Sequence, residues 1–300
     1  MTPEWIAVDW GTSHLRAFAM QGTRAFAEVS SDNGMGKLAR DQFETALLDL
    51  IAPWLAGPVD IVACGMVGSR QGWHEAPYRS VPCTPVDAGT LARVPTHDPR
   101  LRLSLVPGLK QPAPADVMRG EETQIAGALA LLPGFDGVLC LPGTHSKWVH
   151  VSAGEVVSFV TCMTGEMFAL LSRQSVLRHG MEGDGWDDAA FDVALSDALS
   201  RPERLGSRLF SLRAEGLLND LSPSAAKARL SGLLIGVELA ATRAYWLGQP
   251  VAIVGADRLA ALYARALTAQ GAAPRVLSVR DATLAGLAFA RQTAHSEAYR

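Results

Sequence analysis

The chain has 300 residues, a formal net charge of −3 and 48% hydrophobic residues, enough apolar material for two packed domains. Charged residues make up only 19%, and the lack of a basic block argues against a role in binding DNA or RNA. No apolar run reaches the roughly 18 residues of a membrane helix, and the first predicted strand begins too early for a signal peptide. The scattered cysteines lack metal-ligand spacing, so we expect reduced thiols in a cytoplasmic protein; they are Cys64, Cys83, Cys140 and Cys162.

The first predicted element is an apolar strand at residues 6–8 that ends in Asp9. A turn of Gly11, Thr12 and Ser13 follows, and then a second strand near residues 15–20. A tight hairpin points several backbone N–H groups at one spot, an arrangement that binds phosphate. Asp9 could hold Mg²⁺, which prefers a few carboxylates together with substrate phosphates. We interpret the hairpin as half of a nucleotide-phosphate site; an ordinary hairpin with a polar tip is the alternative.

The next elements form an α/β unit. A strand at 25–29, a helix at 40–56 and a strand at 60–64 are predicted. Eight of the chain's 17 prolines lie between Pro77 and Pro114, which predicts strands and loops there, either as a substrate cap or as a surface excursion. A helix at 117–132 follows, because an apolar stripe with helical spacing contains Glu122; its other members are Met118, Ile125, Leu129 and Leu132.

The second half repeats this order of elements. A strand at 138–141 leads into a turn of Gly143, Thr144, His145, Ser146 and Lys147. Strands at 148–151 and 156–159, helices at 167–179 and 224–247, and a strand at 251–254 follow. The repetition predicts a duplicated α/β unit whose two hairpins grip one polyphosphate from both sides. A last helix at 281–292, with Asp281 as its N-cap, and a frayed tail at 295–300 end the chain.

Five motifs resemble the 2-dehydro-3-deoxygalactonokinase family of the sugar kinase, Hsp70 and actin superfamily. They lie at residues 8–13, 34–36, 65–73, 118–124 and 141–148. The resemblance implies an α/β fold of duplicated ribonuclease H-like (actin-like ATPase) domains with an interdomain cleft. It assigns residues 1–117 and 282–300 to the first domain and 118–281 to the second, with closure about two crossing helices. It also implies transfer of phosphate from ATP, with Mg²⁺, to the terminal 6-hydroxyl of 2-keto-3-deoxygalactonate.

The catalytic base cannot be carried over from the superfamily, because the second turn lacks the aspartate that many members have there. Glu122 is the best replacement, as burial in the apolar stripe would raise its pKa toward that of a useful base. Glu121 is rotated by ~100° on the helix and is the second choice. We expect Glu122 to act as base or metal organiser. The alternative is that both are helix-start carboxylates stabilised by the macrodipole.

Phosphate binding is assigned to both turns. The hydroxyls of Thr12, Ser13, Thr144 and Ser146 can donate to phosphate oxygens or to metal-bound water. Lys147 could neutralise the γ-phosphate as a point charge, with a solvated strand residue as the alternative. His145 fits a simple polar turn residue better than a proton carrier.

Arg70 and Arg119 are the candidates for the substrate carboxylate, because guanidinium matches a carboxylate in bidentate geometry. For Arg70 the alternative is a surface ion pair. The loops expected on the same side of the first domain contain Ser69, Gln71, Trp73, Gly34, Met35 and Gly36. The glycine between strand and helix at Gly255 and Ala256 would let the adenine base lie close to the backbone, where superfamily members place it.

Other functions are less well supported by the sequence. A P-loop, a serine-hydrolase elbow and a second histidine at zinc spacing are all missing. The Gly-Glu-Glu motif also resembles exopolyphosphatases, so a phosphohydrolase is one rival and a non-catalytic nucleotide-gated sensor is another. The expected partners are ATP and a small sugar acid, without nucleic acid or membrane. A homodimer stays open, and galacto and gluco substrates are not distinguished.

Overall fold

The computed structural model describes residues 1–297, which divide into two compact units. The first unit contains residues 1–136, 151–158 and the C-terminal segment from Leu277. The second unit contains residues 137–150 and 159–276. This division groups the helix expected near 117–132 with the first unit, whereas the resemblance assigns it to the second domain. The functional division at residues 117 and 282 stays a prediction.

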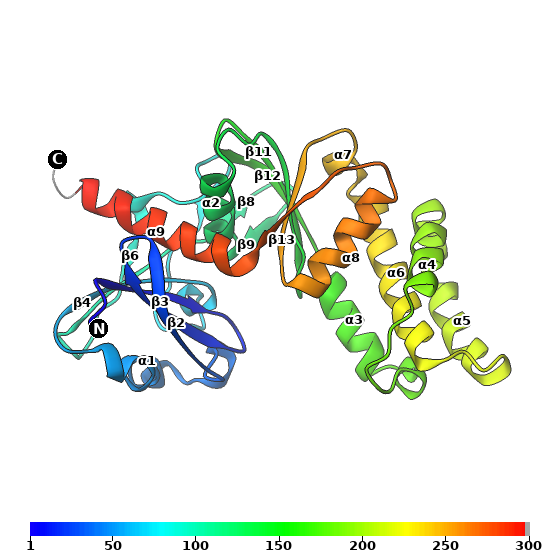
Figure 1. Ribbon diagram of the computed structural model, residues 1–300, viewed down its shortest axis with the longest axis horizontal. Helices are drawn as coiled ribbons and strands as arrows, with labels where there is room; N and C mark the ends of the chain where they lie inside the picture. Colours follow the sequence, from blue (N-terminus) through cyan, green and yellow to red (C-terminus); the bar gives the residue numbers. More distant parts are fainter. Residues whose placement is uncertain (298–300) are drawn as a thin grey trace. The chain divides into compact units, whose positions relative to one another are not determined.

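The first sheet has the strand order β3-β2-β1-β4-β7-β6. Its strands β2, β3, β4 and β6 are labelled in Figure 1. β1 is antiparallel to β2, which is antiparallel to β3, whereas β1, β4 and β7 are parallel neighbours. The bounds are β1 Trp5–Trp10, β2 Leu15–Gln21, β3 Arg24–Ser31, β4 Val59–Cys64, β6 Ala92–Arg93 and β7 Leu101–Leu105. Both faces of the central strands are covered, so β1 is a nearly continuous apolar run rather than an alternating one.

The second large sheet repeats this order as β12-β11-β10-β13-β14. In both sheets three consecutive strands lie side by side, and the fourth pairs in parallel with the first. The bounds are β10 Gly137–Leu141, β11 Ser146–Ser152, β12 Glu155–Cys162, β13 Val251–Gly255 and β14 Arg275–Ser278. The predicted duplicated, ribonuclease H-like α/β fold is therefore confirmed.

The helices of the first unit differ from the prediction at their ends. α1 (Phe43–Ile51) is shorter than residues 40–56, because its flanks are 3-10 turns and Pro53 lies in the second of them. α2 (Glu121–Leu131) begins four residues later than predicted. Residues 116–118 form β9 instead, in which Met118 pairs with Leu109, and Gly120 adopts a φ of 105°. α9 (Val279–Glu297) is longer than residues 281–292, so 295–297 are helical rather than frayed; residues 298–300 lie outside the described chain.

α2 and α9 pack at unusually short range within the first unit. A Cβ on Gly127 of α2 would lie 1.7 Å from the carbonyl oxygen of Ala282 in α9. A Cβ on Gly286 of α9 would lie 1.9 Å from the carbonyl oxygen of Thr123 in α2. The two glycines therefore allow the helix backbones to touch, which any larger residue would prevent.

The second unit contains more helix than predicted. The expected helix at 167–179 is α3 (Thr164–Arg173) followed by a 3-10 segment, Val176–Gly180. The expected helix at 224–247 is α6 (Pro223–Ala241) followed by α7 (Arg243–Trp246). Two helices between them were not predicted, α4 (Asp188–Ser200) and α5 (Leu205–Leu218). α8 (Asp257–Thr268) follows β13.

The proline-rich segment forms short strands and loops in the first unit, as predicted. β5 (Arg79–Ser80), β8 (Leu109–Gln111) and β9 (Asp116–Met118) make a small sheet.

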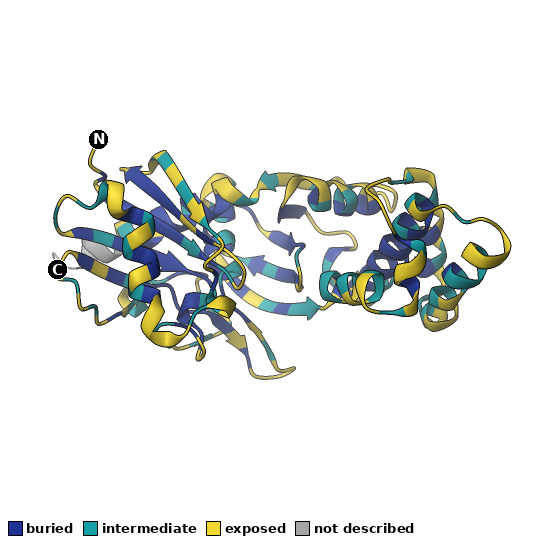
Figure 2. Cartoon of the chain, turned by 90° about the horizontal axis from the view of Figure 1, so that it is seen from below, coloured by how far each residue is buried: buried dark blue, intermediate teal, exposed yellow. Residues whose placement is uncertain are grey.

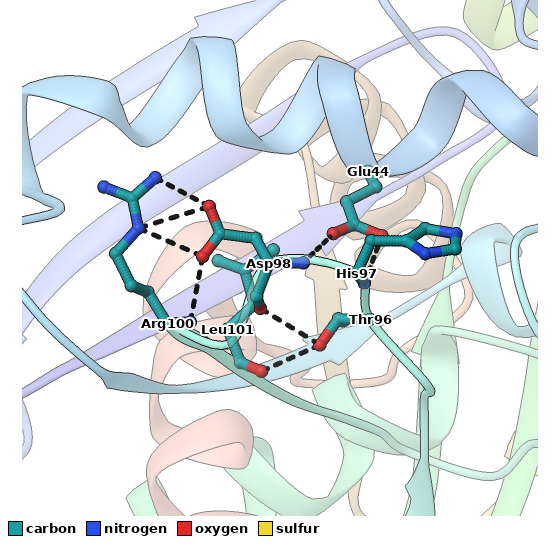
Figure 3. Close-up of polar contacts among 6 residues, drawn as sticks. All are labelled: Glu44, Thr96, His97, Asp98, Arg100 and Leu101. Carbon is teal, nitrogen blue, oxygen red and sulfur yellow. Dashed lines mark hydrogen bonds and ion pairs between the residues drawn. The ribbon is translucent and has the colours of Figure 1, made fainter.

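Glu44 of α1 holds the loop before β7 in place. Its carboxylate accepts hydrogen bonds from the backbone N–H groups of His97 (3.0 Å) and Asp98 (2.6 Å; Figure 3). Asp98 in turn pairs with Arg100 at 2.6 Å.

The central strands β1 and β10 are almost entirely buried, whereas the edge strand β3 is not, and Figure 2 shows burial concentrated on the strands inside the sheets. α1 buries one face, whereas α6 is buried on most sides. All four cysteines are free within the described chain, and Cys64 and Cys140 are buried in strands as expected. Over residues 1–297, the helices all fall short of the length and apolar composition that crossing a bilayer requires.

Candidate active site

The first turn connects β1 to β2. Trp10 pairs with Leu15, and the Gly11 N–H donates to the His14 carbonyl at 3.0 Å, which closes a tight turn. Thr12 and Ser13 lie exposed at its tip. The buried apolar residues of β1 anchor the strand, so the turn projects from a rigid support.

The Gly34-Met35-Gly36 segment packs directly behind this turn. The Met35 N–H donates to the Gly11 carbonyl and the Gly36 N–H donates to the Thr12 carbonyl, each at 2.9 Å. A Cβ on Gly34 would lie 2.2 Å from the backbone carbon of Ser13. This segment therefore supports the turn at Gly11, Thr12 and Ser13, and its predicted substrate-binding role stays a prediction.

Asp9 lies at the end of β1, one residue before Trp10. Its side chain is 28% exposed, and its Oδ2 is 3.6 Å from Nη1 of Arg16. Partial burial raises the pKa of Asp9, and the Arg16 charge opposes that shift. Asp9 is therefore an accessible carboxylate at the end of β1 whose pKa is raised above its ordinary value.

Glu122 is buried at the start of α2. Its Oε2 accepts the Gly120 N–H at 2.7 Å, and its Oε1 accepts the Thr123 hydroxyl at 3.2 Å. Burial, and then the neighbouring Glu121 charge, raises the pKa of Glu122 to about 8. Glu121 is partly exposed and accepts the Arg119 N–H at 3.0 Å. The predicted burial and raised pKa of Glu122 are therefore present; its catalytic role stays a prediction.

Cys64 shows that the two carboxylates share one neighbourhood in the first unit. It is the register partner of Asp9 across β1 and β4. Burial raises the pKa of its thiol, and the charges of Asp9 and Glu122 add to that shift. A Cβ on Gly120 would be 3.3 Å from Cα of Gly65, which brings the start of α2 to the end of β4.

Arg119 is a buried guanidinium with unmet donors. It is only 7% exposed, its Nη2 donates to the Ala76 carbonyl at 2.8 Å, and its Cζ is 4.3 Å from the centroid of the Tyr78 ring. Its Nε and Nη1 have no hydrogen-bond partner among the described residues, and the buried hydroxyl of Ser69 has none there either. Buried donors without acceptors are costly and favour an anionic ligand.

Arg70 and its neighbours have a different environment. The Arg70 side chain is 81% exposed, with Nε 3.6 Å from Oε1 of Glu75, which matches the alternative of a surface ion pair. Gln71 is also exposed. Trp73 packs against Trp10 and Phe43, with ring centroids 6.2 and 6.3 Å apart. Of the two arginines, Arg119 has the stronger geometry for binding an anion.

The second turn lies between β10 and β11, and the start of α3 packs behind it. A Cβ on Gly165 would be 2.2 Å from the Gly143 carbonyl oxygen, and the Glu166 N–H donates to the Thr144 carbonyl at 2.9 Å. Nε2 of His145 is 2.6 Å from Oε2 of Glu166. A carboxylate from α3 therefore reaches the turn that has none of its own.

Ser146 and Lys147 are both buried, although the turn residues before them are exposed. Lys147 is 5% exposed and its Nζ donates to the Thr161 hydroxyl at 2.8 Å, so the alternative of a solvated strand residue is wrong. The Ser146 hydroxyl lies 2.9 Å from the Tyr263 hydroxyl. The Ser146 hydroxyl therefore contacts the interior of the second unit.

A cavity of about 530 Å³ opens in the second unit beside the second turn. Gly143, Thr144 and Ala256 all line it, so the predicted phosphate turn and adenosine loop are brought together. Gly255 precedes Ala256 at the end of β13. The volume suits a nucleoside, whose apolar base needs apolar walls and a few polar groups; these include Phe168, Trp186, Leu234, Lys227, Ser231 and Arg258.

Sequence reasoning missed several residues of this region. Thr164, Glu166, Trp186 and Tyr263 come from three different segments, and only the fold brings them to the turn or the cavity. Within residues 1–297, no cluster of three or more histidine, cysteine or acidic residues could hold a metal ion. Mg²⁺ fits Asp9 only in company with phosphate and water, the combination it prefers.

Comparisons with known proteins identify the family of the chain. Residues 9–290 match the family model of 2-keto-3-deoxy-galactonokinase. The chain is 40% identical to the probable 2-dehydro-3-deoxygalactonokinase DgoK1 of Rhizobium meliloti, covering 95% of this chain and 96% of the relative. It is 35% identical to the 2-dehydro-3-deoxygalactonokinase of Escherichia coli K12, covering 99% and 100%.

Solved structures give the same result. A Sinorhizobium meliloti protein provisionally assigned as a 2-dehydro-3-deoxygalactonokinase superposes with a TM-score of 0.89 at 39% identity, covering 96% of this chain and 98% of that one. The activator of the 2-hydroxyisocaproyl-CoA dehydratase from Clostridium difficile, with bound ADPNP, shares the fold at a TM-score of 0.54 and 12% identity, covering 98% and 97%. The full-length match shows that the chain belongs to the 2-keto-3-deoxy-galactonokinase family.

Proposed function

We propose that the protein transfers the γ-phosphate of ATP to the 6-hydroxyl of 2-dehydro-3-deoxygalactonate, in galactonate catabolism in the cytoplasm. The family relationship supports the reaction, since both curated relatives carry the name of this kinase. The structural observation that carries the substrate class is Arg119, a buried guanidinium with two unmet donors. A Cβ on Gly68, the residue before Ser69, would lie 3.0 Å from its Nη1. A sugar acid supplies the carboxylate that such a site requires.

The nucleotide is assigned to the second unit. Adenosine would occupy the cavity, with its base against Trp186 and the backbone at Ala256, which line it, and near Gly255, which precedes Ala256. Its phosphates would bind the turn at Gly143 and Thr144. Phosphate binding by the turn at Gly11, Thr12 and Ser13 stays a prediction. Lys147 is too deeply buried for a direct contact unless its bond to Thr161 opens.

Asp9 and Glu122 are the carboxylates proposed for the chemistry. Asp9 is accessible and would hold Mg²⁺ through phosphate and water, and the ion would then neutralise charge on the transferring group. The acceptor hydroxyl loses its proton to a carboxylate as its oxygen bonds to the γ-phosphorus and ADP leaves. Glu122 has a pKa of about 8 but is fully buried, so it can act as base only if the Gly120 segment moves.

The test is an ADP-release assay with purified protein, ATP, Mg²⁺ and 3-deoxy-2-keto sugar acids of both galacto and gluco configuration. Turnover should require a sugar acid, and mass spectrometry should find the 6-phosphate. No turnover with any of these acids would refute the proposal. Phosphate release from ATP or polyphosphate without an acceptor would instead favour the rival phosphohydrolase.

Arg119 is tested in the same assay. Arg119→Met should raise the KM for the sugar acid by roughly 100-fold with little change in the KM for ATP, because a charged hydrogen-bonded pair contributes about 3 kcal/mol. Arg24→Met is the matched control, since Arg24 is exposed on β3. Equal KM values in both variants would remove Arg119 from the substrate site.

A further inference from the structure

A buried carboxylate in α6 lies at the centre of a hydrogen-bond network in the second unit. Glu238 is 3% exposed. Its Oε1 accepts the indole N–H of Trp148 and its Oε2 accepts the hydroxyl of Tyr263, both at 2.7 Å. The side chains of Thr164 and Ser146 also hydrogen-bond to it.

The four donors come from three elements around the second turn. Ser146 and Trp148 belong to β11, which the turn leads into, and Thr164 is the first residue of α3. Tyr263 belongs to α8, and its hydroxyl is also 2.9 Å from Ser146 Oγ. One carboxylate thus connects α6 to β11, α3 and α8.

These elements are the ones that shape the nucleotide region. Thr164 and Tyr263 line the cavity together with Gly143 and Thr144 of the turn. The residues after Thr164 are Gly165 and Glu166, which pack against the turn from behind. The network therefore joins the turn, its support and a wall of the cavity.

Burying a carboxylate at this position costs free energy. Burial raises the pKa of Glu238, and only its hydrogen bonds offset the cost of the charge. An apolar residue of similar size would pack in α6 without that penalty, as Leu239 does next to it. The carboxylate adds directional hydrogen bonds, and a fully satisfied network of such bonds fixes one arrangement of the donor side chains.

We propose that Glu238 is a positioning residue for nucleotide binding, because it holds the second turn and the start of α3 in register with the cavity wall. It acts through Ser146, Trp148, Thr164 and Tyr263 and touches no reactant itself. The inference rests on the proposed function in placing the nucleotide in this cavity and in taking it to be ATP.

The experiment measures the Kd of ADP and of a nonhydrolysable ATP analogue by titration calorimetry, without sugar acid. Glu238→Leu should weaken binding of both at least 10-fold. Glu238→Gln should recover part of that loss, because it keeps the length and one acceptor oxygen. In the kinase assay the KM for ATP should rise while the KM for the sugar acid changes less than about twofold.

Leu239→Ala is the control for a merely structural role. Leu239 is fully buried in the same helix and is not a wall of the cavity, so this variant should lower Tm without weakening nucleotide binding. If Glu238→Leu does not fold, Tyr263→Phe and Ser146→Ala should each weaken binding by about 3- to 10-fold.

Two outcomes would overturn the inference. The first is wild-type nucleotide affinity in folded Glu238→Leu or in both hydroxyl variants. The second is a loss of affinity that Leu239→Ala matches at equal loss of Tm. Because binding is measured without sugar acid, failure of the proposed kinase reaction would leave this test intact and separately readable.

Discussion

The two turns lie in the same arrangement of strands but are held in place by different contacts. In each unit the segment after the third strand places a glycine against the turn between the first two strands, Gly34 in one and Gly165 in the other. The first turn is held by two main-chain hydrogen bonds from Met35 and Gly36. The second has one, from Glu166, and relies on side chains for the rest.

The carboxylates behind the turns differ in the same way. Near the first turn, Asp9 is accessible and Glu122 has three hydrogen-bond donors: the Gly120 N–H, the Thr123 hydroxyl and its own backbone N–H. Near the second, Glu238 has four, from residues far apart in the sequence. The comparison teaches that a duplicated backbone can keep its shape while the carboxylates near its two turns differ in exposure and in the residues that hydrogen-bond to them.

The largest expected effect comes from removing the feature that both turns share. Gly34→Ala and Gly165→Ala would each force a Cβ to within 2.2 Å of turn backbone. We expect kcat/KM to fall about 100-fold in both, because displacement of a binding turn by about 1 Å has that effect.

Matched controls are available for both glycines. Alanine at Gly57 or Gly206 would meet no heavy atom of the described chain within 4 Å, so these variants should stay within about twofold of wild type. A wild-type kcat/KM in Gly165→Ala with a large loss in Gly34→Ala would show that the second turn is adaptable and break the parallel.

A smaller effect is expected in the pH dependence of the unfolding free energy, because of the buried carboxyl of Glu122. A folded-state pKa of about 8 for Glu122 means that the folded protein keeps a proton that the unfolded chain releases near its ordinary value of 4.5. Its favourable contribution is therefore complete below about pH 4.5 and is lost as pH rises through 8. Between pH 6 and 8.5 the wild type should lose about 2.5 kcal/mol more unfolding free energy than Glu122→Gln.

Urea denaturation at the two pH values measures this difference. Parallel pH profiles for wild type and Glu122→Gln would mean that the carboxyl is ionised in the folded protein at neutral pH. That result would contradict the raised pKa of Glu122, which is one of the arguments for its role as proton acceptor.

The smallest effect is expected at the exposed ion pair of the second turn. Both side chains of the His145–Glu166 pair are more than a third exposed, so Glu166→Gln should change the unfolding free energy by less than about 1 kcal/mol. The KM for ATP should rise only about two- to threefold. A loss as large as that of Gly165→Ala would mean that the pair, rather than the glycine contact, holds the turn.

The sequence allowed the sheets and both turns to be predicted, because apolar strands broken by Gly-Thr-x or Gly-Thr-Ser turns are local signals. It also indicated the burial of Glu122 from its place in an apolar stripe. The structure corrected the start of that helix, since Met118 pairs in a strand and Gly120 has a backbone conformation that local periodicity does not reveal.

The side-chain network of the second unit could not be predicted in this way. Glu238 lies in a helix that reads as continuous core, and its donors are separated from it by many residues along the chain. The unmet donors of Arg119 and Ser69 are likewise a property of three-dimensional packing, because a sequence shows an arginine but not the acceptors around it.

The backbone contact between α2 and α9 has a consequence for how the polypeptide is made. Gly127 meets its partner helix only after the ribosome has synthesised Ala282 and Gly286. All residues of the second unit have been synthesised by then, so the first unit is the later of the two to receive its last helix. Translation that stops before residue 277 would therefore release a chain in which the apolar residues of the first unit that α9 covers are exposed.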